Sequence, residues 1–314
     1  MHNTFLSIVG IINNGLEARQ LTSWLTGVFG EVNPKFSDWE VVLVNNIRDQ
    51  TPIDAAVNGL PAELRKHIFL LNLSTPVNRN HAVLAGLDRA NGDWTAIFEF
   101  QFSDRPGLLT ELFEKCQTGF DITYLRGSSG ETGFFSRIFH TILQKSGRLA
   151  LDSRAHDTRL ISRRALNSLL RIRENMRYMK AIYPLVGYNT ASIEVPDALP
   201  GRRDESLHER VRTALTAITS YTTFLRSVMG WMFLFSVIFA GGAILNAVKV
   251  KLTNVDLFGE HVESLSGWAF LVVLISVFFA ITCLNLYIMG IYLSNMYQEM
   301  KGRPPYIIES TRRF

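Results

Sequence analysis

The sequence predicts an α/β domain that is held at a membrane by two C-terminal transmembrane helices. Apolar strand-like runs alternate with helical patterns over the first part of the chain, and two long segments without a charged residue occupy the last third. Strands that alternate with helices are typical of a largely parallel sheet covered on both faces. The formal net charge of +4 at pH 7 is modest, so nucleic-acid binding is not indicated.

The predicted strands are short apolar runs that end at turn residues. They are residues 5–12, 39–46, 67–73, 94–100 and 121–127. Between them, apolar residues recur at helical spacing. The predicted helices are residues 16–29, 52–64, 80–90 and 106–116.

Polar residues stand at the carboxyl ends of these strands. Ligands of open parallel sheets bind beside such ends, so these residues are candidates for a binding site. For each residue alone, an ordinary loop position is the alternative. The candidates are Asn13, Asn14, Gly15, Asn45, Asn46, Glu99, Gln101, Asp104 and Arg126.

The sequence lacks the motifs of several common enzyme classes. It contains no G-x-G-x-x-G, Walker A or nucleophile-elbow motif, which argues against a dinucleotide enzyme, a P-loop ATPase and a serine hydrolase. Asp157 precedes a predicted helix over residues 163–172, and it could cap that helix or act as a base; its position favours capping. Only Cys116 and Cys283 are present, so a disulfide framework is not expected and a reducing compartment fits.

Two uncharged segments predict membrane-spanning helices. Residues 227–248 contain no charge, and at about 1.5 Å per residue they span roughly 33 Å, enough to cross the hydrocarbon core. Residues 264–298 form the second segment. The alternative, a pair of buried helices in a soluble protein, is disfavoured because core helices rarely run this long without a charge.

The distribution of basic residues predicts the orientation in the membrane. Arginine and lysine flank the outer ends of both spans, so the positive-inside rule places both termini in the cytoplasm. Residues 211–226 have an apolar stripe that predicts an amphipathic helix in the interface. The predicted segments are a domain over 1–198, the interfacial helix over 199–226, spans over 227–248 and 264–296, an extracytoplasmic loop over 249–263 and a cytoplasmic tail over 297–314.

Four segments in the C-terminal part resemble a known family. They are HDTRLISRRALNSLL (156–170), RYMKAIYPLVGY (177–188), GRRDES (201–206) and GIYLSNMYQEMKGRPPYIIES (290–310). In this order they resemble the membrane-anchored polyprenyl-phosphate glycosyltransferases, which include dolichol-phosphate mannosyltransferase and bacterial glucosyl transferases for undecaprenyl phosphate. The resemblance covers nearly the whole chain. It implies a GT-A fold and transfer of a sugar from a nucleotide diphosphate sugar to a polyprenyl phosphate.

The resemblance also implies roles for particular residues. Asp157 and Arg159 match the family's Asp-x-Arg-Leu segment and are implied to be catalytic. Arg202 and Ser206 match its Arg-x-x-Gly-Glu-Ser motif and are implied to bind the lipid phosphate. The residues implied to bind the nucleotide sugar are Asn13, Asn14, Asn46, Glu99 and Gln101. Arg126, at the end of a predicted strand, is a further candidate for binding it, through its phosphates.

The N-terminal half departs from the family in its chemistry. The family's metal motif, Asp-x-Asp, aligns with Glu99-Phe100-Gln101. Mg²⁺ and Mn²⁺ prefer charged oxygen ligands, and Gln101 offers only a neutral carbonyl oxygen. Metal ligation by Glu99 and Gln101 is therefore expected to be weak. The family's second strand usually ends in Asp-Asp-Gly-Ser, where this sequence has Asn45-Asn46-Ile47-Arg48. Asn46 can hydrogen-bond the edge of a nucleotide base, but its donors and acceptors differ from those of an aspartate.

Three functions compete on this sequence. The first is a working glycosyltransferase whose partners are a nucleotide diphosphate sugar, a polyprenyl phosphate and the membrane. The second is a non-catalytic relative that acts as a scaffold or partner subunit, which the lost acidic residues suggest. A channel or transporter is disfavoured, because neither span contains a charged residue. Two spans per chain are also compatible with a homo-oligomer.

Overall fold

The soluble part of the chain forms one mixed sheet with helices on both faces. The structure is a computed structural model that describes residues 1–128, 141, 152, 154–172, 179–195, 218, 224–256, 259, 261 and 267–314. Within these residues the strand order is β7-β5-β6-β4-β1-β2-β3-β8. The strands are β1 (His2–Ile12), β2 (Phe36–Asn45), β3 (Ile68–Leu73), β4 (Trp94–Ile97), β5 (Ile122–Gly127), β6 (Ala155–Ser162), β7 (Thr190–Val195) and β8 (Ile308–Arg313).

The sheet is mainly parallel, as the alternation of strands and helices predicts. β1 pairs in parallel with β2 and β4, β2 with β3, and β5 with β7. β6 is antiparallel to both of its neighbours, and β8 is antiparallel to β3. The predicted α/β fold class is therefore confirmed.

The helices divide between the two faces of the sheet. One apolar core lies under α1 (Gly15–Val32), α2 (Thr51–Asn58), α3 (Ala62–Arg65) and α5 (Leu108–Gln117), and α4 (Arg79–Arg89), α7 (Arg163–Arg171) and α8 (Met179–Leu185) cover the other core. Successive residues of β1 alternate between the two: Ile8 belongs to the first core and Val9 to the second. Strand residues that bury side chains on both faces give the continuous apolar runs seen in the sequence.

Several predicted boundaries differ from the structure. The predicted helix over residues 52–64 is two helices, α2 and α3. The predicted strand over residues 94–100 ends at Ile97, because Phe100–Phe102 form a turn of 3₁₀ helix. Asp157 does not cap α7; it lies inside β6, and the Ser162 side chain accepts a hydrogen bond from the Ala165 N–H instead. The strands β6, β7 and β8 were not among the predicted strands.

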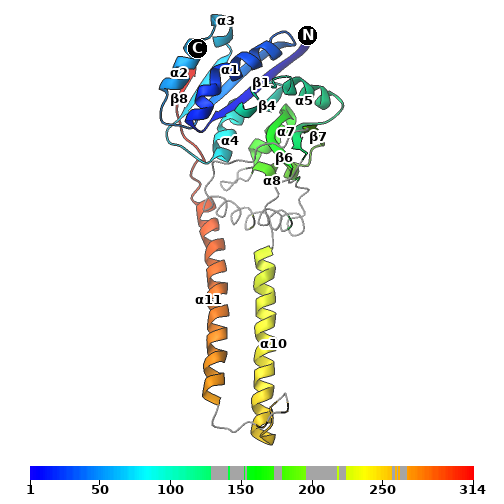
Figure 1. The fold of residues 1–314 in the computed structure, drawn as a ribbon, viewed down its shortest axis with the longest axis vertical. Helices are drawn as coiled ribbons and strands as arrows, with labels where there is room; N and C mark the ends of the chain where they lie inside the picture. Colours follow the sequence, from blue (N-terminus) through cyan, green and yellow to red (C-terminus); the bar gives the residue numbers. More distant parts are fainter. Residues whose placement is uncertain are drawn as a thin grey trace.

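Two long helices project from the sheet domain side by side (Figure 1). They are α10 (Phe224–Thr253) and α11 (Gly267–Met300), and the rings of Phe239 and Phe278 lie 6.0 Å apart between them. Both are long and apolar enough to cross a membrane, and no described side chain of α10 is buried.

The chain returns to the sheet after α11. β8 pairs with the edge strand β3, so residues assigned to a tail by sequence form part of the sheet. The Arg312 guanidinium holds β8 on α2 through the Asp54 carboxylate, with a shortest distance of 2.7 Å. Both termini lie at the sheet domain (Figure 1).

Candidate functional site

The carboxyl ends of β1 and β2 are joined by a pair of asparagines. The Asn46 amide nitrogen donates to Asn13 Oδ1 at 2.9 Å and to the Val77 carbonyl at 2.9 Å. The Val77 N–H donates in return to Asn46 Oδ1 at 2.8 Å. Asn46 therefore fixes the loop that leads into α4 against the end of β1.

Asn14 starts the helix that follows β1. Its side chain accepts a hydrogen bond from the Glu17 N–H at 2.9 Å, as an N-cap does. Glu17 Oε2 in turn accepts from the Asn13 N–H at 2.6 Å. This reciprocal arrangement places the Glu17 carboxylate at the carboxyl edge of the sheet, where burial raises its pKa.

An arginine at the first position of α4 joins this edge to the end of β4. Arg79 Nη1 lies 3.6 Å from Glu17 Oε1, and its Nη2 donates to Glu99 Oε1. The Arg79 side chain is only 15% exposed, so this charge is largely shielded from water. Arg79 Nε and Asn13 Nδ2 are buried donors that find no acceptor among the described residues.

Glu99 is the centre of the charged groups at this edge. Its Oε2 lies 2.9 Å from His156 Nδ1 and accepts from the Gln101 amide at 3.1 Å. Burial acts to raise the pKa of Glu99, but the charges of His156 and Arg79 outweigh it and lower the pKa to about 2. The Glu99 carboxylate is therefore ionised at neutral pH, with both oxygens engaged by donors.

These residues do not fit a resident divalent metal ion. Glu99 Oε1 already faces the Arg79 guanidinium, and the Gln101 side chain turns its amide nitrogen toward Glu99. A metal ion bound to Glu99 would be repelled by the Arg79 guanidinium. Two like unit charges about 4 Å apart repel by about 4 kcal/mol at an effective dielectric constant of about 20, and the double charge of Mg²⁺ or Mn²⁺ doubles that repulsion. No group of three or more histidine, cysteine or acidic side chains that could hold a metal occurs among the described residues.

Asp157 and Arg159 lie beside this cluster on β6. Arg159 is 3% exposed; its guanidinium stacks over the Tyr183 ring at 3.6 Å and donates to the His156 carbonyl at 2.8 Å. Asp157 is close enough to act on the pKa of Glu99. These contacts give Arg159 a role in holding the backbone around His156 and Asp157, and its catalytic role stays a prediction.

The remaining predicted residues lie elsewhere or outside the described residues. Arg126 pairs with Asp152 at 3.0 Å and with Glu194 at 3.5 Å, on β5. Arg202 and Ser206 are not described, and neither is most of the predicted interfacial helix over residues 199–226.

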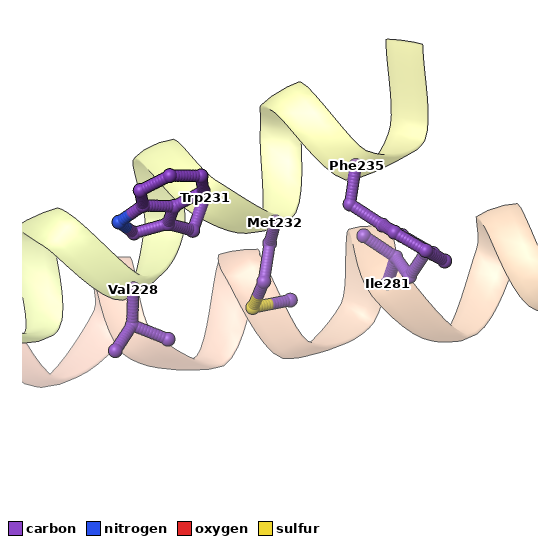
Figure 2. A pocket seen from close by; sticks show the side chains of 5 residues that line it. All are labelled: Val228, Trp231, Met232, Phe235 and Ile281. Carbon is purple, nitrogen blue, oxygen red and sulfur yellow. The ribbon is translucent and has the colours of Figure 1, made fainter. Parts of the chain in front are cut away.

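An apolar hollow lies on the long helices, away from the charged cluster. It has a volume of about 360 Å³ and is lined by Val228, Trp231, Met232, Phe235 and Ile281. Figure 2 shows four of these side chains on α10 and Ile281 on α11. The side chains that line the hollow are apolar or aromatic, which does not suit a charged nucleotide.

The sequence analysis missed Glu17, Arg79 and His156. For Arg79 the sequence did contain one signal, because this arginine stands at the start of a helix. A positive charge there is repelled by the positive end of the helix dipole, so nearby anions are expected to compensate it. Glu17 and Glu99 are those anions. His156 was quoted within a motif, but its contact with Glu99 depends on β6 running antiparallel to β4.

The chain is similar to bacterial and phage glycosyltransferases over almost its whole length. It is 27% identical over 318 residues to the bactoprenol glucosyl transferase of Shigella phage SfII, which covers 98% of each chain. It is 25% identical to an uncharacterized glycosyltransferase of Synechocystis sp., over 86% of this chain and 84% of that protein. It is 22% identical to the uncharacterized glycosyltransferase YkcC of Bacillus subtilis, over 99% and 94%.

The similarity to solved structures is lower than the similarity to these relatives. The complex of Mycobacterium tuberculosis glucosyl-3-phosphoglycerate synthase with Mn²⁺ and uridine-diphosphate-glucose has a TM-score of 0.44 and 14% identity, over 69% of this chain and 77% of that one. No family model matches the chain.

Proposed function

We propose that this chain, a glycosyltransferase homologous to the bactoprenol glucosyl transferases, moves a sugar from a nucleotide diphosphate sugar to a polyprenyl phosphate. The observation that carries the proposal is a similarity that extends through the sheet domain and both long helices, at 98% coverage of each chain. A scaffold without activity is not favoured by these relatives.

The membrane is the natural place for this reaction. A polyprenyl phosphate keeps its chain in the bilayer and its phosphate at the surface. The exposed apolar helices α10 and α11 provide an anchor, and the excess of arginine and lysine beside them favours a cytoplasmic sheet domain. Nucleotide sugars are then available on the same side.

The reaction requires little acid–base chemistry. An oxygen of the lipid phosphate attacks the anomeric carbon of the sugar, and the bond from that carbon to the diphosphate oxygen breaks. The nucleoside diphosphate leaves with the electron pair. The attacking phosphate is already ionised at neutral pH, so the protein acts by positioning and by stabilising charge.

The charged cluster supplies the donor side of this mechanism. Asn13, Asn14, Asn46, Glu99 and Gln101 are proposed to bind the nucleotide sugar, because the structure gathers them at the carboxyl ends of β1, β2 and β4. Arg126 is proposed to bind the donor from the end of β5, which β6 separates from β4 in the sheet. No step of the reaction is assigned to Mg²⁺ or Mn²⁺, since both oxygens of Glu99 are engaged by other groups.

The residues proposed to bind the lipid phosphate acceptor and to position it come from β6 and from later parts of the chain. Asp157 is proposed to orient the sugar or the acceptor, and Arg159 to hold the backbone that carries it. Arg202 and Ser206 are proposed to bind the lipid phosphate. Turnover of polyprenyl phosphate should fall in Arg202→Lys, which lacks the bidentate fork, but not in Arg212→Lys at matched membrane binding. Equal activities would remove Arg202 from the site.

A further inference from the structure

The position of Arg79 gives the site a fixed positive charge from the protein itself. Its guanidinium lies between two carboxylates from different elements, Glu17 on α1 and Glu99 after β4. A buried guanidinium keeps its charge at all relevant pH values. The cluster therefore already contains a cation beside Glu99, where the family resemblance aligns a metal motif.

Two unpartnered donors point to an anionic ligand at the same edge. Arg79 Nε and Asn13 Nδ2 are buried and have no acceptor among the described residues. Leaving a buried donor unpaired costs free energy that an acceptor from a ligand can recover. The helix dipole at the start of α4 also favours an anion, although the N–H groups of Asn80, His81 and Ala82 already donate to Asn78.

We infer that Arg79 supplies the charge that holds the donor diphosphate, so that donor binding does not depend on a divalent metal ion. This inference rests on the proposed function. A nucleoside diphosphate oxygen takes over one of the two positions that Glu17 and Glu99 now occupy around the guanidinium. Glu17 is the partner that yields more readily, because it is the more distant one and burial already disfavours its charge.

The arrangement explains why the loss of an anionic ligand at Gln101 is compatible with donor binding. A site that binds its donor through a metal needs negative ligands to hold that metal. A site that binds through a guanidinium needs fewer, because each added carboxylate competes with the diphosphate for the cation. One carboxylate at Glu99 is enough to orient Arg79.

The test is binding of UDP and GDP, measured by isothermal titration calorimetry on the detergent-purified full chain, in EDTA and in Mn²⁺. Wild type should bind at least one of them in EDTA with an affinity within threefold of that in Mn²⁺. Arg79→Gln should weaken binding in EDTA at least tenfold. Arg89→Gln is the matched control: it removes the same charge from the other end of α4, where Arg89 faces Glu40 at 3.9 Å and lies over Phe69.

A second readout does not use a nucleotide. In Arg79→Gln, Glu99 is released from its guanidinium, so Mn²⁺ alone, followed by electron paramagnetic resonance, should bind at least tenfold more tightly than to wild type or Arg89→Gln. Thermal melts check that each variant is folded at the assay temperature. A purely structural ion pair would lower the melting temperature and leave binding in EDTA unchanged.

The outcomes separate this inference from the proposed function. Nucleotide binding that requires Mn²⁺ in wild type, or equal binding in EDTA by wild type and Arg79→Gln, overturns the inference and leaves the glycosyltransferase standing. Failure of UDP and GDP to bind under any condition counts against both. Metal-independent binding that is lost only in Arg79→Gln, with tighter Mn²⁺ binding in that variant, supports the inference.

Discussion

At the scale of single residues, Asp121 is a buried carboxylate outside the charged cluster that is expected to stabilise the fold. It lies just before β5, is 5% exposed on its side chain, and accepts hydrogen bonds from Arg164 Nη2 at 2.7 Å and Ser162 Oγ at 2.7 Å. The hydrogen bond from Arg164 lowers the pKa of Asp121. Asp121 thereby ties the start of β5 to the end of β6 and the start of α7.

Asp121→Asn should destabilise the sheet domain by about 1–2 kcal/mol at pH 7, because charge-assisted hydrogen bonds are lost. The folded-state pKa is lowered, so the carboxylate's contribution is complete above its unfolded pKa of about 3.9 and disappears as the pH falls through the folded pKa. The difference between the melts of wild type and variant should therefore be constant from pH 7 to about pH 5 and shrink as the pH falls below about 4.

Asp104→Asn is the control for this pH series. Asp104 is 73% exposed on its side chain and faces Arg105 at 3.9 Å, so its replacement should shift the melt little at any pH. A gap between Asp121→Asn and wild type that stays constant down to pH 3 would show that the charge of Asp121 does not stabilise the fold.

The positions of residues at strand ends could be predicted from the sequence, whereas contacts made by side chains that cross between elements could not. Asn13, Asn46 and Glu99 follow parallel neighbours β1, β2 and β4, so their proximity follows from chain order and topology. Arg79 reaches Glu99 from a helix, and His156 reaches it from an antiparallel strand. Neither contact leaves a periodic pattern in the sequence.

At the scale of elements, α4 depends on one close approach to the sheet. A Cβ at Gly86 would overlap Val9 Cγ1 and come within 3.1 Å of Val44 Cγ2. Gly86→Ala should therefore destabilise the domain by about 1–3 kcal/mol, by pushing α4 away from β1 and β2. Because Arg79 begins this helix, nucleoside diphosphate binding should weaken as well.

Gly30→Ala provides the matched comparison for Gly86. Gly30 lies within α1 and a Cβ there meets no atom within 4 Å, so alanine should be neutral or stabilise by up to about 1 kcal/mol. Melting temperatures of the two alanine variants give the test. Equal shifts would mean that α4 can move away from the sheet without cost.

The strand β8 should also contribute to the stability of the sheet domain. Removal of residues 306–314 would expose the backbone edge of β3 and free Asp54 from Arg312. We expect the truncated chain to be cut faster by a protease in the sheet domain, at equal membrane insertion. A single substitution, Arg312→Ala, should give a smaller effect in the same direction, since its side chain is 39% exposed. Unchanged proteolysis of the truncated chain would show that β8 only rests on the sheet.

Sequence patterns could not reveal β8 or β7. β8 reads IESTRR, a half-exposed edge strand without an apolar run, and its partner is more than 200 residues away along the chain. β7 is only partly buried along most of its length. The strands that were predicted contain continuous apolar runs. β6 reads AHDTRLIS and was missed although its last five residues are buried, because its sequence has no such run.

At the scale of the whole molecule, the two long helices form a hairpin that leaves the sheet domain on one side. Asp256 lies in the connection between them, after the end of α10 at Thr253. In a Cys283→Ala background, Asp256→Cys should be labelled by an impermeant maleimide from outside the cell. A reporter fused after Phe314 should be active inside, because the basic residues flank the outer ends of the helices. The opposite pattern would place the sheet domain away from the nucleotide sugars.

The most direct test of the whole account is sugar transfer by the purified chain. The full chain in detergent is mixed with polyprenyl phosphate and a panel of radiolabelled nucleotide diphosphate sugars, with EDTA or Mn²⁺. One of the sugars should pass to the lipid, with release of one nucleoside diphosphate for each glycosylated lipid, and the Arg79→Gln variant should be impaired in EDTA. Binding of nucleotide sugar and lipid without transfer of any sugar in the panel would contradict the glycosyltransferase function.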